Sequence, residues 1–258
     1  MDLGIAGRKA IVCASSKGLG KACAKALAQA GCHVVLNGRN AKKLEATAQE
    51  IRATGAEVIA IPGDIGEARV RKALLAACPA PDILVNNNGG PPPQAFRTIT
   101  RYDVLRGLEA NMLTPIALTQ AVLPGMAQRR FGRVINITSS SVRAPIAGLD
   151  VSSGARAGLT AFLASSARAL ARDNVTINSI QPGAFDTDRI RVGLVNQAAK
   201  RGLDEAQIRA EREASIPAGR FGRAEELGQL CAYLASAQAG YITGQNILID
   251  GGAFPGVF

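Results

Sequence analysis

The sequence predicts a doubly wound α/β fold of the Rossmann type, in which one sheet of seven mainly parallel strands carries helices on both faces. The first observation is that short β-branched runs alternate with Ala/Leu-rich stretches along the whole chain. Such alternation gives right-handed βαβ units, which place helices on both faces of a parallel sheet. The second is that no linker, repeat or low-complexity segment divides the 258 residues. We therefore expect a single domain over residues 1–258.

The predicted elements follow one another in a regular order. Seven β-branched runs are expected to form strands, at 10–13, 34–36, 58–61, 83–85, 134–137, 175–178 and 247–249. Apolar residues recur between them at helical spacing, as in the stripe of Leu19, Cys23, Ala26, Leu27 and Ala30 and in that of Leu159, Phe162, Leu163 and Leu170. Two segments break this order. The proline-rich residues 89–93 predict a stiff loop, and the polar residues 186–217 predict either a lid over a substrate or a solvated surface helix.

The composition narrows the possible functions. The net charge is +10, but the basic residues are dispersed and 7 Phe, 3 Tyr and no Trp leave few rings to stack on bases, so we expect no nucleic-acid partner. No apolar run reaches the roughly 18 residues of a membrane span, so we expect no membrane partner. The N-terminus does not resemble a signal peptide, which predicts a cytoplasmic location. The 5 cysteines are odd in number and lack metal-ligand spacing, so we expect buried, reduced thiols and no metal.

A glycine-rich segment follows the first predicted strand and opens the first predicted helix. Glycine at such a turn lets the backbone approach a pyrophosphate, and the helix N-terminus offers free N–H groups and the positive end of the helix dipole. The segment therefore predicts a nucleotide-phosphate site formed by Ala14, Ser15, Ser16, Lys17, Gly18, Leu19 and Gly20.

The same segment begins a resemblance to the short-chain dehydrogenase/reductase family that covers nearly the whole chain. The family's Thr-Gly, three residues and then Gly-x-Gly is similar to Cys13-Ala14 followed by Gly18-Leu19-Gly20, with Ala14 in place of the first glycine. Later matches are Asp64, Asn86-Asn87-Asn88-Gly89, Asn111, Pro182-Gly183 with Thr187, Ile242-Thr243-Gly244 and Asp250-Gly251-Gly252. The resemblance implies a nicotinamide cofactor held also by Asp64, Ile65, Asn87, Asn88, Gly89, Pro182, Gly183 and Thr187.

The charge at the end of the second predicted strand favours NADP(H) over NAD(H). NAD sites of this kind hold the ribose 2′-hydroxyl with a carboxylate about 20 residues past the glycines. This chain has Asn37 and Arg39 there, and no Asp or Glu between Leu3 and Leu44. A guanidinium can bind a 2′-phosphate through two hydrogen bonds. We therefore expect Arg39 to clamp the 2′-phosphate, with Lys17 in support and Asn37 also at the cofactor.

The catalytic positions depart from the family pattern. The resemblance implies a Ser, an Asn on a neighbouring helix, a Tyr thirteen residues after the Ser and a Lys four residues later. Ser139 and Asn111 are present, but Ser152 and Arg156 stand at the Tyr and Lys positions, and no Tyr or Lys lies between residues 103 and 199. A serine hydroxyl is far less acidic than a phenol, and a guanidinium does not release a proton near neutral pH. We expect these four residues to form the catalytic group, with an altered proton relay.

Three proton sources and three functions remain open at this stage. Water held by Ser139, Ser152 and Asn111 could protonate the product oxygen, Asp150 could do so if it were buried, or the substrate could carry its own acidic group. The protein could be an NADP(H)-dependent carbonyl reductase, a nucleotide-binding sensor or regulatory protein without turnover, or a lyase or isomerase that uses the pocket without redox chemistry. We expect His33, at the start of the second predicted strand, to have a structural role.

The resemblance also implies partners. It implies a homo-oligomer, usually a tetramer, built on long helices at 101–129 and 152–172 and on the C-terminal strand. It implies a small carbonyl substrate, 3-oxoacyl-like or another small keto compound. An anionic substrate would meet Arg143, Arg189 and Arg191.

Overall fold

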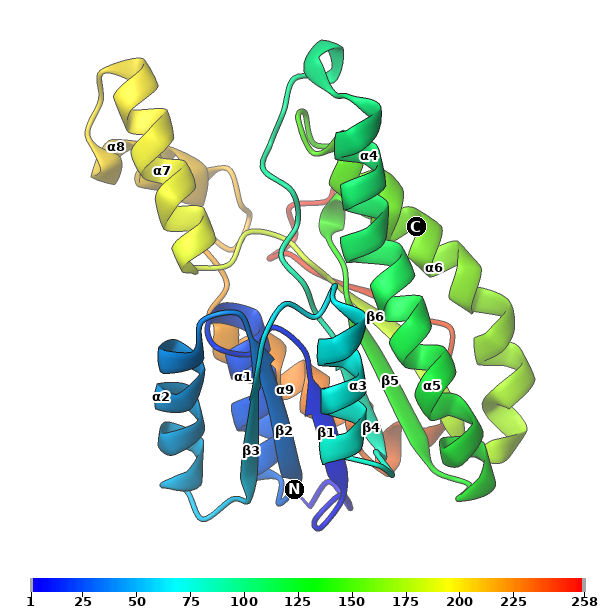
Figure 1. The fold of residues 1–258 in the computed structure, drawn as a ribbon. Helices are drawn as coiled ribbons and strands as arrows, with labels where there is room; N and C mark the ends of the chain where they lie inside the picture. The colour runs from blue at the N-terminus through cyan, green and yellow to red at the C-terminus, as the bar shows by residue number, and fades with distance from the viewer. Residues whose placement is uncertain (1, 257–258) are drawn as a thin grey trace.

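The computed structural model describes residues 2–256, and these contain a seven-stranded sheet whose neighbouring strands all pair in parallel. The strand order is β3-β2-β1-β4-β5-β6-β7 (Figure 1). The bounds are β1 Lys9–Val12, β2 His33–Gly38, β3 Val58–Pro62, β4 Ile83–Asn86, β5 Gly132–Ile137, β6 Val175–Pro182 and β7 Asn246–Ile249. The predicted fold class is confirmed. The order changes direction between β1 and β4, which is where doubly wound sheets bind ligands.

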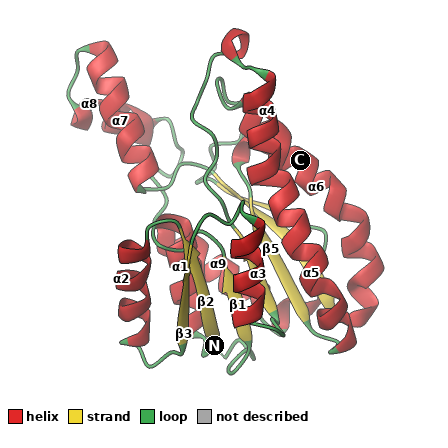
Figure 2. Cartoon of the chain, viewed as in Figure 1, coloured by secondary structure: helices red, strands yellow, loops and turns green. Residues whose placement is uncertain are grey.

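Helices cover both faces of the sheet (Figures 1 and 2). One face carries α1 (Gly18–Gln29), α2 (Ala41–Arg52) and α9 (Ala224–Ala235), and the other carries α3 (Ala68–Ala77), α5 (Thr114–Gln128) and α6 (Asp150–Leu170). Successive strand residues alternate between the two apolar layers. In β1, Ala10 and Val12 pack in the layer of α1 and α9, whereas Ile11 packs in the layer of α3, α5 and α6. Both faces are therefore apolar, which explains the continuous apolar runs in the sequence.

The helices α1 and α9 pack unusually closely. A Cβ built on Gly228 of α9 would lie 2.5 Å from the carbonyl oxygen of Ala22 in α1. Glycine is required there because any side chain would push the two helices apart. The contact fixes the position of α1, whose first turn belongs to the glycine-rich segment.

The long helix predicted at 101–129 is present, but it has three parts because a π-helical turn interrupts its α-helical pattern. The parts are α4 (Arg101–Leu108), a π-helical turn (Glu109–Leu113) and α5. Pro115 has no backbone N–H, so the regular i to i−4 hydrogen bond cannot form at that residue. A π-helical turn alters the direction of its side chains and is frequent at functional sites. Asn111 lies within it.

Residues 186–217 contain two helices, α7 (Asp188–Arg201) and α8 (Glu205–Ala214). They have a small apolar core of their own, which includes Leu194, Ile208 and Phe221. Figure 1 shows the pair standing beyond the carboxyl ends of the strands, at the upper left. This is the edge at which a ligand would bind. The position of α7 and α8 therefore suits a lid, and the lid stays a prediction.

The five cysteine side chains lie in the core, as expected. All 5 cysteines are buried and free, and burial raises the pKa of Cys13 and of Cys32 to about 12. They are therefore unreactive core residues. Within residues 2–256, no helix combines the length and apolar character needed to cross a bilayer.

Candidate cofactor and substrate site

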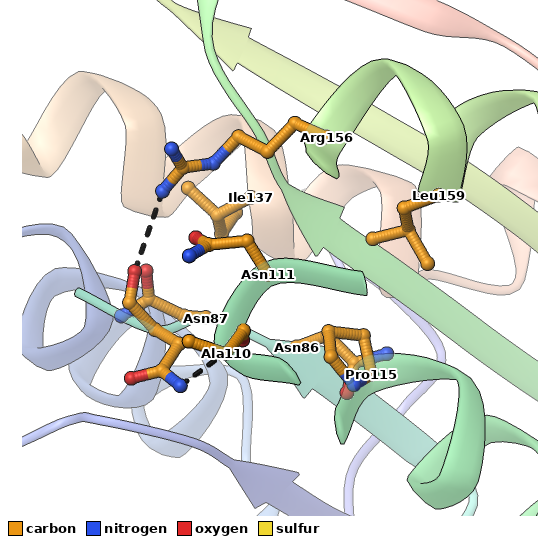
Figure 3. A pocket seen from close by; sticks show the side chains of 9 residues that line it. Asn86, Asn87, Ala110, Asn111, Pro115, Ile137, Arg156 and Leu159 are labelled. Carbon is orange, nitrogen blue, oxygen red and sulfur yellow. Dashed lines mark hydrogen bonds between the residues drawn. The ribbon is translucent and has the colours of Figure 1, made fainter. Parts of the chain in front are cut away.

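A small pocket lies at the carboxyl ends of the central strands. Figure 3 shows Arg156 reaching across it toward the segment that follows β4. The lining residues are Asn86, Asn87, Asn88, Ala110, Asn111, Pro115, Ile137, Arg156 and Leu159. The structure thus brings together four predicted site residues, which come from the end of β4, the π-helical turn and α6.

The turn between β1 and α1 is held by side chains from its surroundings. Ala14 has φ +45°, in the left-handed region where a Cβ costs about 1–2 kcal/mol. Asn87 Nδ2 donates a hydrogen bond to the Ala14 carbonyl oxygen at 3.2 Å, and Ser15 Oγ donates to the Val12 carbonyl oxygen at 2.9 Å. The turn therefore keeps its shape although alanine stands where glycine would be unstrained.

The start of α1 is suited to an anion. The helix has no side-chain cap and no acidic residue in its first turn, so its N–H groups and the positive end of its dipole are available to a phosphate. Gly18 has φ +56°, and a Cβ on Gly20 would lie 2.4 Å from the Ala14 carbonyl oxygen. These features fit the pyrophosphate of a dinucleotide.

The two predicted residues at the end of β2 have different surroundings. Asn37 is buried, and its Nδ2 donates to the carbonyl oxygens of Ile61 and Gly63 at 3.1 and 3.2 Å. Its Oδ1 accepts the N–H of Ala14 at 3.4 Å, so the amide shapes the loops and does not face a ribose. Arg39 is exposed, and in the described part of the chain no carboxylate pairs with it. Its guanidinium is therefore available to a phosphate.

Lys17 has a partner in the 186–217 segment. Its Nζ lies 2.8 Å from Oδ2 of Asp188, and this ammonium group lowers the pKa of Asp188. A Cβ built on Gly18 would lie 3.7 Å from Cγ2 of Thr187, so the start of α7 also touches the glycine-rich turn. The predicted support of Lys17 for a 2′-phosphate would require this exposed ion pair to open.

The remaining predicted cofactor residues lie in loops at the carboxyl edge of the sheet. Asp64 follows β3 and accepts the N–H of Gly66 at 2.9 Å, while Ile65 is buried in the apolar core. Pro182 ends β6, and a Cβ on Gly183 would lie 2.6 Å from Cβ of Asp250. These residues lie at the edge where the cofactor is expected, and their contact with it stays a prediction.

The asparagines after β4 join the neighbouring elements. Asn88 Nδ2 donates to the Ala110 carbonyl oxygen in the π-helical turn at 3.1 Å, and its Oδ1 accepts the N–H of Gly89 at 2.8 Å. Asn111 is buried, and its Nδ2 lies 3.5 Å from the Gly107 carbonyl oxygen. Because that bond is long, the Asn111 amide can also bind a molecule in the pocket.

Ser152 and Arg156 form a buried pair one turn apart on α6. Ser152 is 2% exposed and Arg156 is 8% exposed. Arg156 donates from Nη1 to Ser152 Oγ and from Nη2 to the Asn88 carbonyl oxygen at 3.4 Å. Burial and, to a lesser degree, the nearby Arg189 lower the pKa of Arg156 to about 10, so the guanidinium is charged at neutral pH. No carboxylate of the described residues pairs with it, and such a charge favours an anionic or hydroxyl-rich ligand.

One of the three arginines expected at an anionic substrate approaches the pocket. A Cβ on Gly90 would lie 3.0 Å from Nη1 of Arg189 and 3.1 Å from Nη1 of Arg156, so both guanidinium groups approach the same loop. Arg143 and Arg191 are instead hydrogen-bonded to protein side chains. The local positive charge therefore comes from Arg156 and Arg189.

Ser139 belongs to a group of hydroxyls that the sequence did not identify. Its Oγ accepts both the backbone N–H and the hydroxyl of Ser141, at 3.1 and 2.9 Å. Ser153 Oγ donates to Ser141 Oγ at 2.8 Å. The only sequence signal for this group is a run of serines after one strand and another pair of serines at the start of the next helix.

Two other titratable residues were considered from the sequence. Asp150 is exposed in the first turn of α6, so the burial that its proposed acid role required is absent and that suggestion is wrong. His33 lies at the start of β2, at the edge opposite the pocket, with its Nδ1 2.7 Å from Glu57 Oε2. Its position away from the site is as predicted.

The fold and the glycine-rich turn define a dinucleotide-binding protein of the Rossmann type, and comparisons with known proteins identify its family. The family model described as Enoyl-(Acyl carrier protein) reductase matches residues 13–253. The chain belongs to the short-chain dehydrogenase/reductase family of oxidoreductases, and its relatives include 3-oxoacyl-(acyl-carrier-protein) reductases.

Several relatives match over their full length. The NADPH-dependent reductase BacG of Bacillus subtilis is 32% identical, over 97% of this chain and 99% of the relative. The 3-oxoacyl-(acyl-carrier-protein) reductase FabG of Aquifex aeolicus is 32% identical, over 98% of this chain and 100% of the relative. The crystal structure of L-sorbose reductase from Gluconobacter frateurii, in complex with NADPH and L-sorbose, superposes with a TM-score of 0.94 at 26% identity, over 100% of both chains.

Proposed function

We propose that this protein is an NADP(H)-dependent oxidoreductase that reduces the carbonyl group of a small substrate, with a proton relay that lacks the Tyr and Lys of its family. The observation that carries the proposal is the buried, charged Arg156 beside a pocket lined by Asn88 and Asn111 at the carboxyl edge of the sheet. Relatives named as NADPH-dependent reductases support the cofactor and the reaction class.

Three parts of the chain would hold NADP(H). The uncapped start of α1 suits the pyrophosphate, and the unpaired Arg39 suits the 2′-phosphate. Arg156, at the position of the family's Lys, would hold the hydroxyls of the nicotinamide ribose. When bound, the cofactor supplies the hydride.

The remaining residues would act on the substrate oxygen. The Ser139 hydroxyl can donate to this oxygen, and the charge of Arg156 in a buried pocket favours the negative charge that develops on it. We do not assign Arg156 as the acid, because a guanidinium group retains its proton in proteins. The Ser152 hydroxyl orients Arg156 by accepting its hydrogen bond.

The absence of a phenol reduces the rate without preventing the reaction. A positioned acid or base contributes about 10²- to 10⁴-fold in rate. Alignment of the hydride donor with the carbonyl supplies effective molarities of about 10⁵ M or more. We therefore expect slow but measurable turnover.

The paired guanidinium groups favour an anionic substrate. Arg156 and Arg189 approach Gly90 from two elements, and within residues 2–256 neither has a carboxylate partner. A carboxylate or phosphate ester on the substrate would compensate both charges. We expect a keto acid or a keto compound with an acidic group to be reduced faster than its neutral methyl ester.

A homotetramer is part of the proposal. Apolar side chains are exposed on the α4–α5 stretch and on α6, among them Tyr102, Leu105, Leu113 and Phe162. Contact between copies would bury them. Sedimentation at micromolar concentration should give a species of four chains, and a monomer would contradict this part.

The first experiment is a fluorescence titration of the purified protein with NADPH and with NADH, followed by a panel of β-keto esters, keto acids, quinones and diketones. Tight NADPH binding and oxidation of NADPH by one of these compounds would support the reductase. Substrate loss at constant NADPH absorbance would instead indicate a lyase or isomerase.

A nucleotide-binding protein without turnover is the second candidate. It is favoured by the burial of Ser152, whose hydroxyl is already bonded to Arg156 where the family has its proton donor. Tight NADPH binding with no reaction on any compound would support it against the reductase.

A further inference from the structure

Three serine hydroxyls form a continuous hydrogen-bonded chain from α6 to the end of β5. Ser153 Oγ lies 2.8 Å from Ser141 Oγ, and Ser141 Oγ lies 2.9 Å from Ser139 Oγ. Both separations are ordinary for O–H···O hydrogen bonds. The chain therefore connects the first turns of α6 with the loop that follows β5.

The two ends of this chain differ in their access to water. Ser141 is only 4% exposed and forms an enclosed middle link. Ser153 is half-buried and so can exchange a proton with solvent. Ser139 is also half-buried, and it follows β5 at the carboxyl edge, where the pocket lies.

The hydrogen-bond count assigns a direction to the chain. Ser139 Oγ accepts the Ser141 N–H and the Ser141 hydroxyl, which occupies both of its lone pairs. Its own hydrogen is then free to be donated to a partner other than Ser141. A serine with this pattern is a fixed donor at the point where the family places its catalytic serine.

We propose that Ser139 gives the proton to the reduced substrate and that Ser141 and Ser153 replace it from solvent. This inference rests on the proposed function, since it names the proton source of that reaction. As hydride reaches the carbonyl carbon and the C=O π bond breaks, the oxygen takes the Ser139 hydrogen. Ser139 takes the hydrogen of Ser141, Ser141 takes that of Ser153, and Ser153 takes a proton from water, so that one solvent proton is consumed per hydride.

The transfers must be concerted with the hydride step. A free serine alkoxide is too high in free energy to form near neutral pH. A concerted shift avoids it, because all three serines are neutral hydroxyls before and after the step. Arg156 follows Ser153 by about one turn of α6, so its positive charge favours the partial negative charge on the relay during the shift. The family's Tyr is then replaced by several weak donors acting together.

The protein offers a matched control in the same turn. Ser140 lies between Ser139 and Ser141 and is also half-buried, but its hydroxyl forms no hydrogen bond to the protein among residues 2–256. Ser140→Ala removes one hydroxyl from the same turn and leaves the hydrogen-bonded chain intact. Ser153→Thr keeps a hydroxyl at the solvent end.

The test compares Ser141→Ala, Ser153→Ala, Ser153→Thr and Ser140→Ala with the wild-type chain, using NADPH and the carbonyl compound turned over fastest in the panel above. We expect Ser141→Ala to lower kcat by about 10- to 100-fold, part of the range for a positioned acid, with the Kd for NADPH and the KM changed less than twofold. Ser153→Ala should also lower kcat, and Ser153→Thr should retain most of the wild-type kcat. Ser140→Ala should match the wild type.

The solvent isotope effect separates a relay from a merely structural role. For the wild type, we expect the rate to fall in D₂O, with a curved dependence on the D₂O fraction because several protons move together. Ser141→Ala should remove the curvature. Unchanged kcat in Ser141→Ala, or an equal loss of kcat and of NADPH affinity, would overturn the relay while leaving the reductase standing. If the wild-type chain oxidises no NADPH, both proposals fail together.

Discussion

Arg39 stands exposed at the carboxyl end of β2 without a carboxylate partner, which makes it the residue that should distinguish the two cofactors. Charge-assisted hydrogen bonds to the 2′-phosphate are worth about 1.5–3 kcal/mol, and each 1.4 kcal/mol changes affinity about tenfold. We expect Arg39→Ala to weaken NADPH binding by about 10- to 100-fold and to change NADH binding less than twofold. Fluorescence titration measures both. Lys42→Ala, which removes a nearby exposed charge, is the control, and an equal effect on both cofactors would contradict the assignment.

The sequence predicted which residue types lie at the cofactor edge better than it predicted what their side chains do. Asn37 is at the predicted place, but its amide bonds to the backbone of the neighbouring loops and of β3, where it donates to the carbonyl oxygens of Ile61 and Gly63 and accepts the N–H of Ala14. Lys17 pairs with Asp188, which is 171 residues away along the chain. Contacts of this kind depend on the folded loops and leave no local pattern to read.

At the scale of elements, the close contact between α1 and α9 should control the glycine-rich turn. In Gly228→Ala the added Cβ would meet backbone at 2.5 Å, so the helices must separate. We expect a loss of about 1–3 kcal/mol in the free energy of unfolding and weaker NADPH binding, because α1 carries the turn. Urea unfolding and NADPH titration measure the two effects.

The control for this substitution lies in α7. A Cβ on Gly193 would meet no atom within 4 Å, so Gly193→Ala should stabilise the helix by about 0.5–1 kcal/mol. If Gly228→Ala is as well tolerated as Gly193→Ala, the close packing does not hold α1 in place.

The strands were the most predictable elements, because β-branched apolar runs buried on both faces leave a strong pattern. The π-helical turn could not be predicted in the same way. Pro115 alone does not distinguish a kink, a break and a wide turn. Asn111 lies in that turn, so the orientation of its side chain toward the pocket depends on the π-helical turn and could not be predicted from the sequence.

For the molecule as a whole, acid should be destabilising, because several carboxylates have pKa values lowered by ion pairs. The pKa of Glu226 is lowered to about 2, first by hydrogen bonds from Arg220 and then by the backbone N–H of Arg223 at the start of α9. Arg201 lowers the pKa of Glu211 in the same way. The unfolded chain binds protons near pH 4.5, where the folded chain does not, so stability is full above that pH and is lost as the pH falls toward 2.

Glu226→Gln tests this argument at one carboxylate that also joins α9 to the rest of the fold. At pH 7 the variant should melt a few degrees below the wild type, since it loses the negative charge that pairs with Arg220. The Gln carbonyl oxygen can still accept the Arg223 N–H, which Glu226 accepts at 2.7 Å, but as a neutral and weaker acceptor. The difference should shrink as the pH falls from about 5 toward 2, because the wild-type carboxylate becomes protonated in both states. Glu225→Gln removes a neighbouring charge without an ion pair among the described residues and should show a smaller, pH-independent change. If the Glu226→Gln difference stays constant down to pH 2, the ion pairs at α9 contribute no acid sensitivity to the fold. Acid unfolding would then come mainly from charge repulsion, because the net charge of +10 grows as carboxylates protonate.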